Sequence, residues 1–241
     1  MKKDFTIIAL GGSLIVPQLS DKGGINVGFL RQFRKLLLQE IKHGKRFVLI
    51  VGGGKTARVY QKAVIDTVGK KQEDLDWIGV HATKLNAELL LSIFKKEAYF
   101  QVISDAISKK EMDKAKKNKN SLFIASGGTP GSSTDTVAVL LAQEFGVKEI
   151  IVAGNTPFVY EKDPRQNRNV KPLPELTWSE YQKLIPKKWS PGLSTPVDPV
   201  AAKLARKIGL TAKIIQGTDL SNFKKAIEGK SFRGTLITPK S

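Results

Sequence analysis

Three glycine-rich loops contain the residues with which this chain could do chemistry. They are Gly11-Gly12-Ser13, Gly52-Gly53-Gly54-Lys55 and residues 126–135, which read Ser-Gly-Gly-Thr-Pro-Gly-Ser-Ser-Thr-Asp. Glycines let backbone N–H groups approach a ligand closely. A helix N-terminus, predicted after residue 134, adds unpaired N–H donors and partial positive charge. Three such loops predict a crevice for several phosphate or carboxylate groups, although each loop alone could be a tight turn.

Two cations and several hydroxyl groups accompany these loops. Lys55 and Arg58 fall in the first turn of the helix predicted after the triple glycine, where a cation is slightly unfavourable unless an anion lies above it. Arg58 could bind a phosphate through two parallel hydrogen bonds, whereas Lys55 would act as a mobile point charge. Ser132, Ser133 and Thr134 add hydroxyl donors. A role as ordinary solvated cations is the alternative for Lys55 and Arg58.

Two familiar phosphate-binding motifs do not fit the second loop. Gly54-Lys55-Thr56 matches the end of a Walker A loop, but that motif requires glycine where this chain has Leu49. Residues 52–57 fit the glycine fingerprint of dinucleotide-binding folds loosely. That fingerprint also needs an acidic residue after the next strand, about 20 residues on. The next predicted strand begins only at Tyr99, so a nicotinamide cofactor is not expected.

The sequence offers no convincing pair of nucleophile and base. It has no cysteine and two histidines. His43 precedes a glycine at a predicted helix end and is expected to be exposed, while His81 falls within a predicted helix and is expected to pack or face solvent. The remaining cations, backbone donors and carboxylates suit phosphoryl transfer, which needs positioning and charge stabilisation. No metal site made by protein side chains is predicted.

The elements that must position these loops alternate between strand and helix. Continuous apolar runs predict strands at 5–10, 47–51, 99–103, 122–125, 149–153, 212–215 and 234–238. Helical periodicity predicts helices at 27–41, 55–68, 77–96, 105–117, 135–145, 178–185, 199–208 and 220–227. This alternation predicts an α/β fold, a three-layer αβα sandwich around a mainly parallel sheet. The three loops would then meet beyond the carboxyl ends of the strands.

We expect one domain, 1–241, made of two lobes. Residues 155–175 are rich in proline, asparagine and charge, and are predicted to form a long loop. Thr177 or Ser179 could cap the helix that follows. The N-terminal lobe would extend over about 1–154 and the C-terminal lobe over about 155–241.

Composition narrows the class of partner. The chain has 241 residues and a formal net charge of +18, which favours anionic partners. Its densest cationic cluster, 109–119, contains acidic residues and no aromatic ones, so we expect small phosphorylated ligands and no specific nucleic acid. The first apolar run is too short for a secretion signal, and no run approaches the ~18–20 residues of a membrane span. With the absence of cysteine, this predicts a cytoplasmic protein without a membrane partner.

Six motifs in order make the chain resemble the amino acid kinase superfamily, most closely the archaeal-type uridylate (UMP) kinases. The motifs are Gly11-Gly12-Ser13, Val51-Gly-Gly-Gly-Lys-Thr-Ala-Arg58, Gly127-Gly-Thr with Ser133-Thr-Asp135, Asn155 with Val159-Tyr160 and Asp163-Pro164, Asp198-Pro-Val-Ala-Ala-Lys203, and Gly234-Thr-Leu-Ile237. They extend over nearly the whole chain. The resemblance implies ATP-dependent phosphorylation of UMP to UDP in pyrimidine nucleotide synthesis. It also implies ATP and Mg²⁺ as cofactors, with the Mg²⁺ bridging the ATP phosphates, and a homo-oligomer, namely a hexamer.

The resemblance implies roles for individual residues as well. The catalytic residues would be Lys55, Arg58, Asp135 and Lys203. Asp135 would organise nearby cations, and Lys55 would meet the transferring phosphate, with Lys203 as the reserve. The ATP site would use Gly11, Gly12, Ser13 and Gly53 around the phosphates. In the C-terminal lobe, Asn155, Tyr160 and Asp163 would surround the nucleoside. Core packing is the alternative for Tyr160.

The acceptor site in the N-terminal lobe would hold UMP. Its residues would be Gly52, Asp76, Thr129, Pro130, Gly131, Ser132, Ser133 and Thr134. Asp76 would bind the ribose hydroxyls, unless it only caps the helix predicted from Trp77.

Three departures from the family pattern bear on function. Many members have lysine two residues before the first glycine pair, where this chain has Ala9. The usual Asn-x-Asp-Gly-Val-Tyr reads Asn155-Thr-Pro-Phe-Val-Tyr160, so Pro157 and Phe158 remove a carboxylate and a glycine from the ATP side. The loop 129–134 is about one residue shorter than in many relatives, which could reshape the acceptor pocket.

Other functions stay open at this point. Another phosphotransferase of the superfamily could act on isopentenyl phosphate, carbamate or an acyl-amino acid. The isopentenyl phosphate enzymes carry a histidine near the triple glycine, which is absent here. A protein that binds nucleotides or anions without turnover is favoured by Ala9 and Pro157-Phe158. Binding to a polyanion, suggested by the charge, would depend steeply on salt.

Overall fold

The computed structural model describes residues 5–19, 23–69, 72–104, 109–131, 133–164, 166–167, 169–190, 193 and 195–239. Ser132, predicted to bind the acceptor, lies outside the described residues. So does the beginning of the helix predicted at 105–117.

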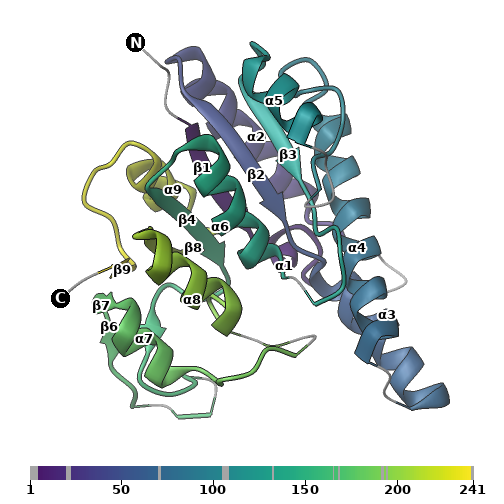
Figure 1. The fold of residues 1–241 in the computed structure, drawn as a ribbon, viewed down its shortest axis with the longest axis vertical. Helices are drawn as coiled ribbons and strands as arrows, with labels where there is room; N and C mark the ends of the chain where they lie inside the picture. The colour runs from purple at the N-terminus through teal and green to yellow at the C-terminus, as the bar shows by residue number, and fades with distance from the viewer. Residues whose placement is uncertain are drawn as a thin grey trace.

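A seven-stranded sheet forms the centre of the described part of the chain, in the order β3-β2-β1-β4-β8-β9-β7 (Figure 1). Its strands are β1 (Phe5–Leu10), β2 (Arg46–Val51), β3 (Leu122–Ala125), β4 (Glu149–Gly154), β7 (Glu175–Thr177), β8 (Thr211–Gln216) and β9 (Thr235–Thr238). β1 lies between β2 and β4, with Ile7 opposite both Val48 and Ile150. Neighbouring strands are parallel except β8 and β9, which are antiparallel. The prediction of a mainly parallel sheet is confirmed.

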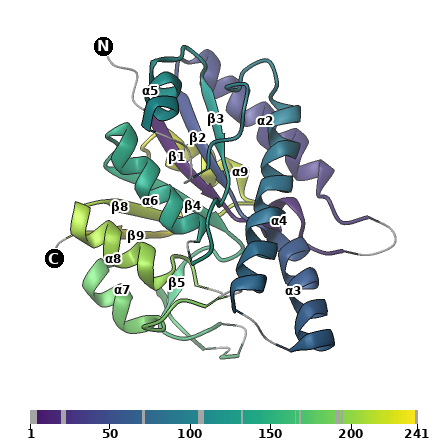
Figure 2. The same cartoon turned by 45° about the vertical axis from the view of Figure 1, so that its right-hand side comes forward.

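Helices cover both faces of this sheet, which confirms the three-layer αβα sandwich (Figures 1 and 2). Successive strand residues point to opposite faces, so Ile7 and Ile8 belong to different cores. The core with Ile7 includes α5 (Lys109–Lys117), α6 (Thr134–Phe145), α7 (Trp178–Leu184) and α8 (Pro199–Ile208). The core with Ile8 includes α1 (Gly12–Ile15), α2 (Val27–Lys42), α4 (Gln72–Ile93) and α9 (Leu220–Ile227). Burial on both faces explains the continuous apolar runs.

α3 (Gly54–Val68) packs against α4 at one edge of the sandwich (Figure 2). The helix predicted at 77–96 is α4, which begins earlier and ends earlier than predicted. Glu73 and Asp74 in its first turn complement the partial positive charge of the helix N-terminus. Asp76 therefore lies inside α4, and the prediction that it could cap this helix is wrong.

Short strands were the other source of error. Residues 99–103 form no strand; isolated bridges join Ala98 to Leu122 and Ile103 to Ala125. The segment 155–175, predicted as one loop, contains β5 (Val159–Tyr160) and β6 (Pro172–Leu173), which pair antiparallel. β7 was also missed. Strands of only two or three residues are stabilised by neighbours that are distant in sequence, so local sequence patterns do not reveal them.

Side chains that cap helices fix where several helices begin. Thr177 and Glu180 form a reciprocal capping box at α7, which confirms the predicted cap. Ser133 caps α6, and Asp198, followed by Pro199, caps α8. These helices begin within one residue of the positions predicted from sequence.

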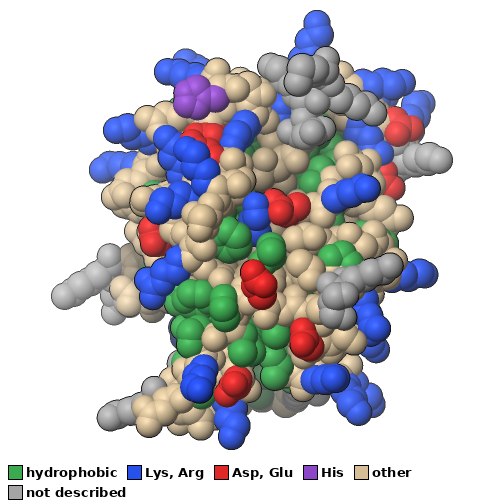
Figure 3. Space-filling model, turned by 90° about the vertical axis from the view of Figure 1, so that its left-hand side faces the viewer, with side chains coloured by type: hydrophobic (Ala, Val, Ile, Leu, Met, Phe, Trp, Pro, Cys, Tyr) green, Lys and Arg blue, Asp and Glu red, His purple; other side chains and the backbone are tan. Residues whose placement is uncertain are grey.

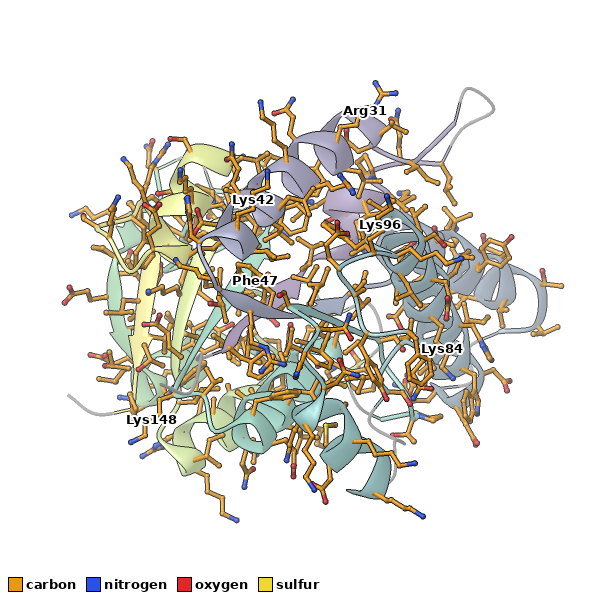
Figure 4. All side chains as sticks on the ribbon, turned by 90° about the horizontal axis from the view of Figure 1, so that it is seen from above. Arg31, Lys42, Phe47, Lys84, Lys96 and Lys148 are labelled. Carbon is orange, nitrogen blue, oxygen red and sulfur yellow. The ribbon has the colours of Figure 1, made fainter. Side chains whose placement is uncertain are left out.

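The positive charge is spread over the surface. Lys and Arg side chains surround the face seen in Figure 3 without gathering at one place. The cations labelled in Figure 4, Arg31, Lys42, Lys84, Lys96 and Lys148, come from different parts of the chain, whereas Phe47 lies between the layers. Of the helices in the described part of the chain, none is both long and apolar enough to cross a membrane.

Candidate active site

A cleft of about 690 Å³ opens at the carboxyl edge of the sheet. All three glycine-rich loops line it, as does the segment that follows β4. The predicted residues among its lining are Gly11, Gly12, Ser13, Gly52, Gly53, Arg58, Asp76, Ser133, Thr134, Asp135, Asn155, Tyr160 and Asp163. One crevice at the ends of parallel strands is therefore built from parts predicted separately along the sequence.

The first two loops contact each other through glycines. A Cβ atom on Gly12 would lie 2.2 Å from the carbonyl oxygen of Gly52 and 2.2 Å from the nitrogen of Gly54. Gly54 has φ +64°, a conformation that other residues rarely adopt. The sequence predicted these glycines as ligand contacts. The structure gives Gly12, Gly52 and Gly54 a packing role as well, because only glycine lets the two backbones approach this closely.

One face of α4 fastens the second and third loops. Asn86 donates from Nδ2 to the carbonyl oxygen of Gly52 at 2.8 Å, and Thr83 Oγ1 accepts from the N–H of Gly127 at 3.0 Å. Asp76 Oδ2 accepts from the N–H of Gly131 at 3.0 Å. Sequence reasoning missed Thr83 and Asn86. Thr83 follows Asp76 by seven residues, and Asn86 follows Thr83 by three. This spacing puts all three side chains on one face of the helix, a pattern that could have revealed Thr83 and Asn86 in the sequence.

Asp76 combines burial with an unused acceptor. The residue is 8% exposed and lines the cleft. Its Oδ1 is buried without a hydrogen-bond partner among the described residues. Burial raises the pKa of Asp76, the hydrogen bond from Gly131 opposes this, and the charge of Glu73 adds a smaller upward shift. A buried carboxylate oxygen without a partner is costly, so this atom is suited to accept hydrogen bonds from a ligand.

The N-termini of α6 and α8 meet at a second cluster of carboxylates. Ser133 Oγ accepts from the N–H groups of Asp135 and Thr136, both at 3.1 Å, and donates to Asp198 Oδ2. The other oxygen of Asp198 accepts from the first turn of α8. The N–H of Asp198 in turn donates to Asp135 Oδ2 at 3.2 Å. Asp198 is 3% exposed, and sequence reasoning gave it no role, although an Asp-Pro pair before an apolar helix predicts an N-cap.

Asp135 is the most strongly perturbed acid in the cleft. Desolvation and, secondly, the charge of Asp198 raise its pKa to about 8, although the hydrogen bond from the Asp198 backbone lowers it. A carboxyl group with this pKa changes its charge near neutral pH. Groups of this kind are enriched in functional sites.

The predicted cations are divided between the cleft and the surface. Arg58 and Lys162 are the basic residues among the described residues that line the cleft. Lys162 was missed by sequence reasoning. The side chains of Lys55 and Lys203 are exposed, and neither residue lines the cleft. The N–H of Lys55 donates to the carbonyl oxygen of Val16 at 3.0 Å, which orients the start of α3.

The third loop is only partly within the cleft. Ser133 and Thr134 line it, whereas Thr129, Pro130 and Gly131 do not. Gly131 has φ +79° and is tied to Asp76. The structure therefore brings the helix end of this loop to the cleft and holds its tip through α4.

Comparisons with known proteins agree with this geometry. A family model described as "Amino acid kinase family" matches residues 4–216. The uridylate kinase of Pyrococcus abyssi is 32% identical over 97% of this chain and 99% of that protein. The uridylate kinase of Hyperthermus butylicus is 28% identical over 99% of this chain and 100% of that protein. The crystal structure of uridylate kinase from Archaeoglobus fulgidus matches with a TM-score of 0.75 and 30% identity, over 96% of this chain and 99% of that one.

The raised pKa of Asp135 predicts a pH-dependent stability. The native carboxyl group retains its proton up to about pH 8, whereas its ordinary pKa is 3.8. Between these values the native state binds more protons than the unfolded state, so the free energy of unfolding falls as the pH rises. Asp135→Asn removes this dependence. From about pH 5 to about pH 8, the wild type should lose roughly 1 kcal/mol or more relative to Asp135→Asn in urea denaturation.

The control is Asp113→Asn, which makes the same change of charge at an exposed position on α5. It should follow the wild type across the same pH range. Equal losses of stability in the wild type and Asp135→Asn would contradict the perturbed ionisation of Asp135.

Proposed function

Because this chain belongs to the amino acid kinase family, we propose that it transfers the γ-phosphoryl group of ATP to UMP, producing ADP and UDP. The observation that carries this is the agreement, over nearly the full length, with uridylate kinases whose loops would end at the same cleft. An oxygen of the UMP phosphate attacks the γ-phosphorus, and the bond to the ADP oxygen breaks. This attacking oxygen is already anionic, so no general base is required.

The transfer point lies between the first two loops. Gly11, Gly12, Ser13 and Gly53 surround the phosphates, and the N-termini of α3 and α6 supply partial positive charge. The packing of Gly12 against Gly52 and Gly54 supports this assignment, because it fixes the loops before nucleotides bind. Donors held in place need no reorganisation during transfer.

The acceptor side is formed by Gly52, Asp76 and residues 129–134. Asp76 offers its buried Oδ1 to the ribose hydroxyls of UMP, which would supply the hydrogen bonds that this atom lacks among the described residues. Its Oδ2 already fixes Gly131. One carboxylate would therefore couple the sugar to the loop that encloses the acceptor.

The donor side is formed by Asn155, Tyr160 and Asp163 in the C-terminal lobe, about residues 155–241. All three line the cleft, and Tyr160 is half-buried there, which supports a ligand contact over core packing. The N-terminal lobe, about 1–154, would carry the acceptor. Within one domain, the two lobes would align two mutually repelling phosphate chains.

Mg²⁺ enters with the phosphates of ATP. In the described part of the chain, no three His, Cys, Asp or Glu side chains converge to hold a metal ion. Mg²⁺ commonly binds through substrate phosphates and only one or two carboxylates, and Asp135, which lines the cleft, would be the carboxylate that helps to hold it. Bound Mg²⁺ supplies charge neutralisation, and Asp135 organises the surrounding cations.

Arg58 is the cation best situated for the transferring phosphate, since it lines the cleft and can bind through two hydrogen bonds. Lys55 and Lys203 remain candidates for the same role, in which their side chains would approach the transferring phosphate from the surface when nucleotides bind. Long, exposed lysine side chains can reorient at little cost.

An apolar surface on α3 and α4 supports a homo-oligomer. Tyr60, Val68 and Leu85 are 61%, 68% and 64% exposed, and Phe100, beyond α4, is 74% exposed. Large exposed apolar residues on neighbouring helices are typical of an interface. We assign this surface to a second copy of the chain, within a cytoplasmic hexamer.

The direct test is a coupled assay with a panel of acceptors. We expect turnover with ATP and UMP, and little with isopentenyl phosphate, carbamate or acyl-amino acids. Turnover of another acceptor without turnover of UMP would overturn the proposal. Nucleotide binding without transfer to any acceptor would instead support a non-catalytic role.

Asp76→Asn tests the acceptor site. The change removes one charged acceptor and keeps an oxygen for Gly131, so the KM for UMP should rise about tenfold or more, as expected for a lost charged hydrogen bond. The KM for ATP should stay the same. Asp74→Asn, an exposed neighbour on α4, is the control and should leave both constants unchanged. An equal rise in both KM values would contradict the assignment.

Substitution by methionine ranks the cations. Arg58→Met should reduce kcat/KM by about 100-fold or more, since it removes charge stabilisation at the transferring phosphate. Lys55→Met and Lys203→Met, made separately, should each have a smaller effect. Lys62→Met on α3, whose side chain pairs with Asp66, is the control. A larger loss from Lys55→Met than from Arg58→Met would move the central role to Lys55.

A further inference from the structure

An aromatic ring lines the cleft three residues after Asn155. Phe158 is half-buried and lines the cleft together with Tyr160. The two rings meet edge to face, with centroids 6.3 Å apart and an interplanar angle of 81°. Phe158 therefore lies on the side that the proposed function gives to the ATP nucleoside, although no role has been assigned to it above.

The backbone around this ring is fixed. Pro157 restricts the chain immediately before it. The N–H of the buried Val159 donates to Thr235 Oγ1 at 2.8 Å, and this hydroxyl donates to the carbonyl oxygen of Leu173 at 2.6 Å. The ring thus stands between two restrained residues and is already oriented before any ligand binds.

A cation that does not line the cleft lies near the Phe158 ring. The guanidinium carbon of Arg233 is 5.9 Å from the centroid of Phe158, and Arg233 does not line the cleft. Asn222 fixes the backbone of Arg233 by two hydrogen bonds of 2.7 Å, one accepted and one donated. This cation can help to hold the ring in place by a cation–π contact, while Phe158 itself lines the cleft.

We infer that Phe158 is the stacking platform for the base of the donor nucleotide, and that this platform makes the donor site tolerant of the base. A fixed aromatic ring binds any nucleobase through its π-face. Neither Pro157 nor Phe158 carries a side-chain hydrogen-bonding group that would distinguish one base edge from another. A platform without such groups adds affinity but cannot itself discriminate strongly between bases. The inference rests on the proposed function only for the identity of this side as the donor side.

Binding to the full-length protein tests the platform without any need for turnover. Dissociation constants of ATP, GTP and CTP are measured by calorimetry for the wild type, Phe158→Leu and Phe158→Trp. Phe158→Leu keeps an apolar side chain but removes the ring, and should weaken all three nucleotides by about fivefold or more. Phe158→Trp should retain the wild-type affinity. The wild type should bind the three nucleotides within about tenfold of one another.

Two control variants locate the effect. Trp77→Leu changes an aromatic residue that is 40% exposed and lies outside the cleft lining, and it should change no affinity. Trp189→Leu changes another aromatic residue of the cleft lining and should have a smaller effect than Phe158→Leu. Thermal unfolding of each variant shows whether the fold is intact.

The outcomes separate this inference from the proposed function. Unchanged affinities in a folded Phe158→Leu would overturn the platform, and so would a loss confined to ATP or a larger loss from Trp189→Leu. If UMP is not phosphorylated but Phe158→Leu still weakens all three nucleotides, the proposed acceptor fails and the platform stands. If UMP is phosphorylated and Phe158→Leu changes no dissociation constant, the proposed acceptor stands and the platform fails.

Discussion

The close approach of two backbones at the carboxyl edge of the sheet is the constraint on which the site depends. Gly12 and the Gly52–Gly54 segment come so near that a single added Cβ would meet backbone atoms at 2.2 Å. β1 and β2 are adjacent and parallel, so their ends deliver these loops to the same place. The sheet supplies the position, and the glycines make the contact possible.

α4 transmits the same constraint to the third loop. Asn86 bonds to Gly52 of the second loop, Thr83 to Gly127 and Asp76 to Gly131. A helix that packs on the sheet thereby sets the distance between the second and third glycine-rich loops. Because these polar groups are buried, leaving one unpaired would cost about 1–3 kcal/mol. The helix therefore holds a geometry that hydrogen bonds within the loops alone do not provide.

The sequence predicted much of this arrangement because its signals are local. Apolar runs such as Phe47 to Val51 mark buried parallel strands, and glycine after such a run marks a turn at the sheet edge. The predictions failed where distant contacts decide. Beside β3, residues 98–103 form isolated bridges in place of the predicted strand, and β5 depends on pairing with β6. The side chains of Thr83, Asn86 and Asp198 gained roles only when the fold brought their partners near. Lys55 directly follows the triple glycine in sequence, yet its side chain is exposed and the residue does not line the cleft.

The distribution of charge explains how such a basic protein can have so few cations in its cleft. The chain carries +18, yet the described residues lining the cleft include two basic residues, Arg58 and Lys162, against five acidic ones. These acidic residues are Asp76, Asp135, Glu161, Asp163 and Asp198. An anion in this cleft would therefore depend largely on backbone N–H groups and helix N-termini, which carry partial positive charge.

The surface lysines act at longer range. Spread over different elements (Figures 3 and 4), they raise the local concentration of anionic nucleotides without fixing their orientation. Salt screens such interactions beyond about 8–10 Å, whereas the hydrogen bonds of the loops persist. The surface lysines therefore attract anions, whereas the hydrogen bonds of the loops fix their orientation. The cleft can contain buried carboxylates because the long-range attraction comes from the surface.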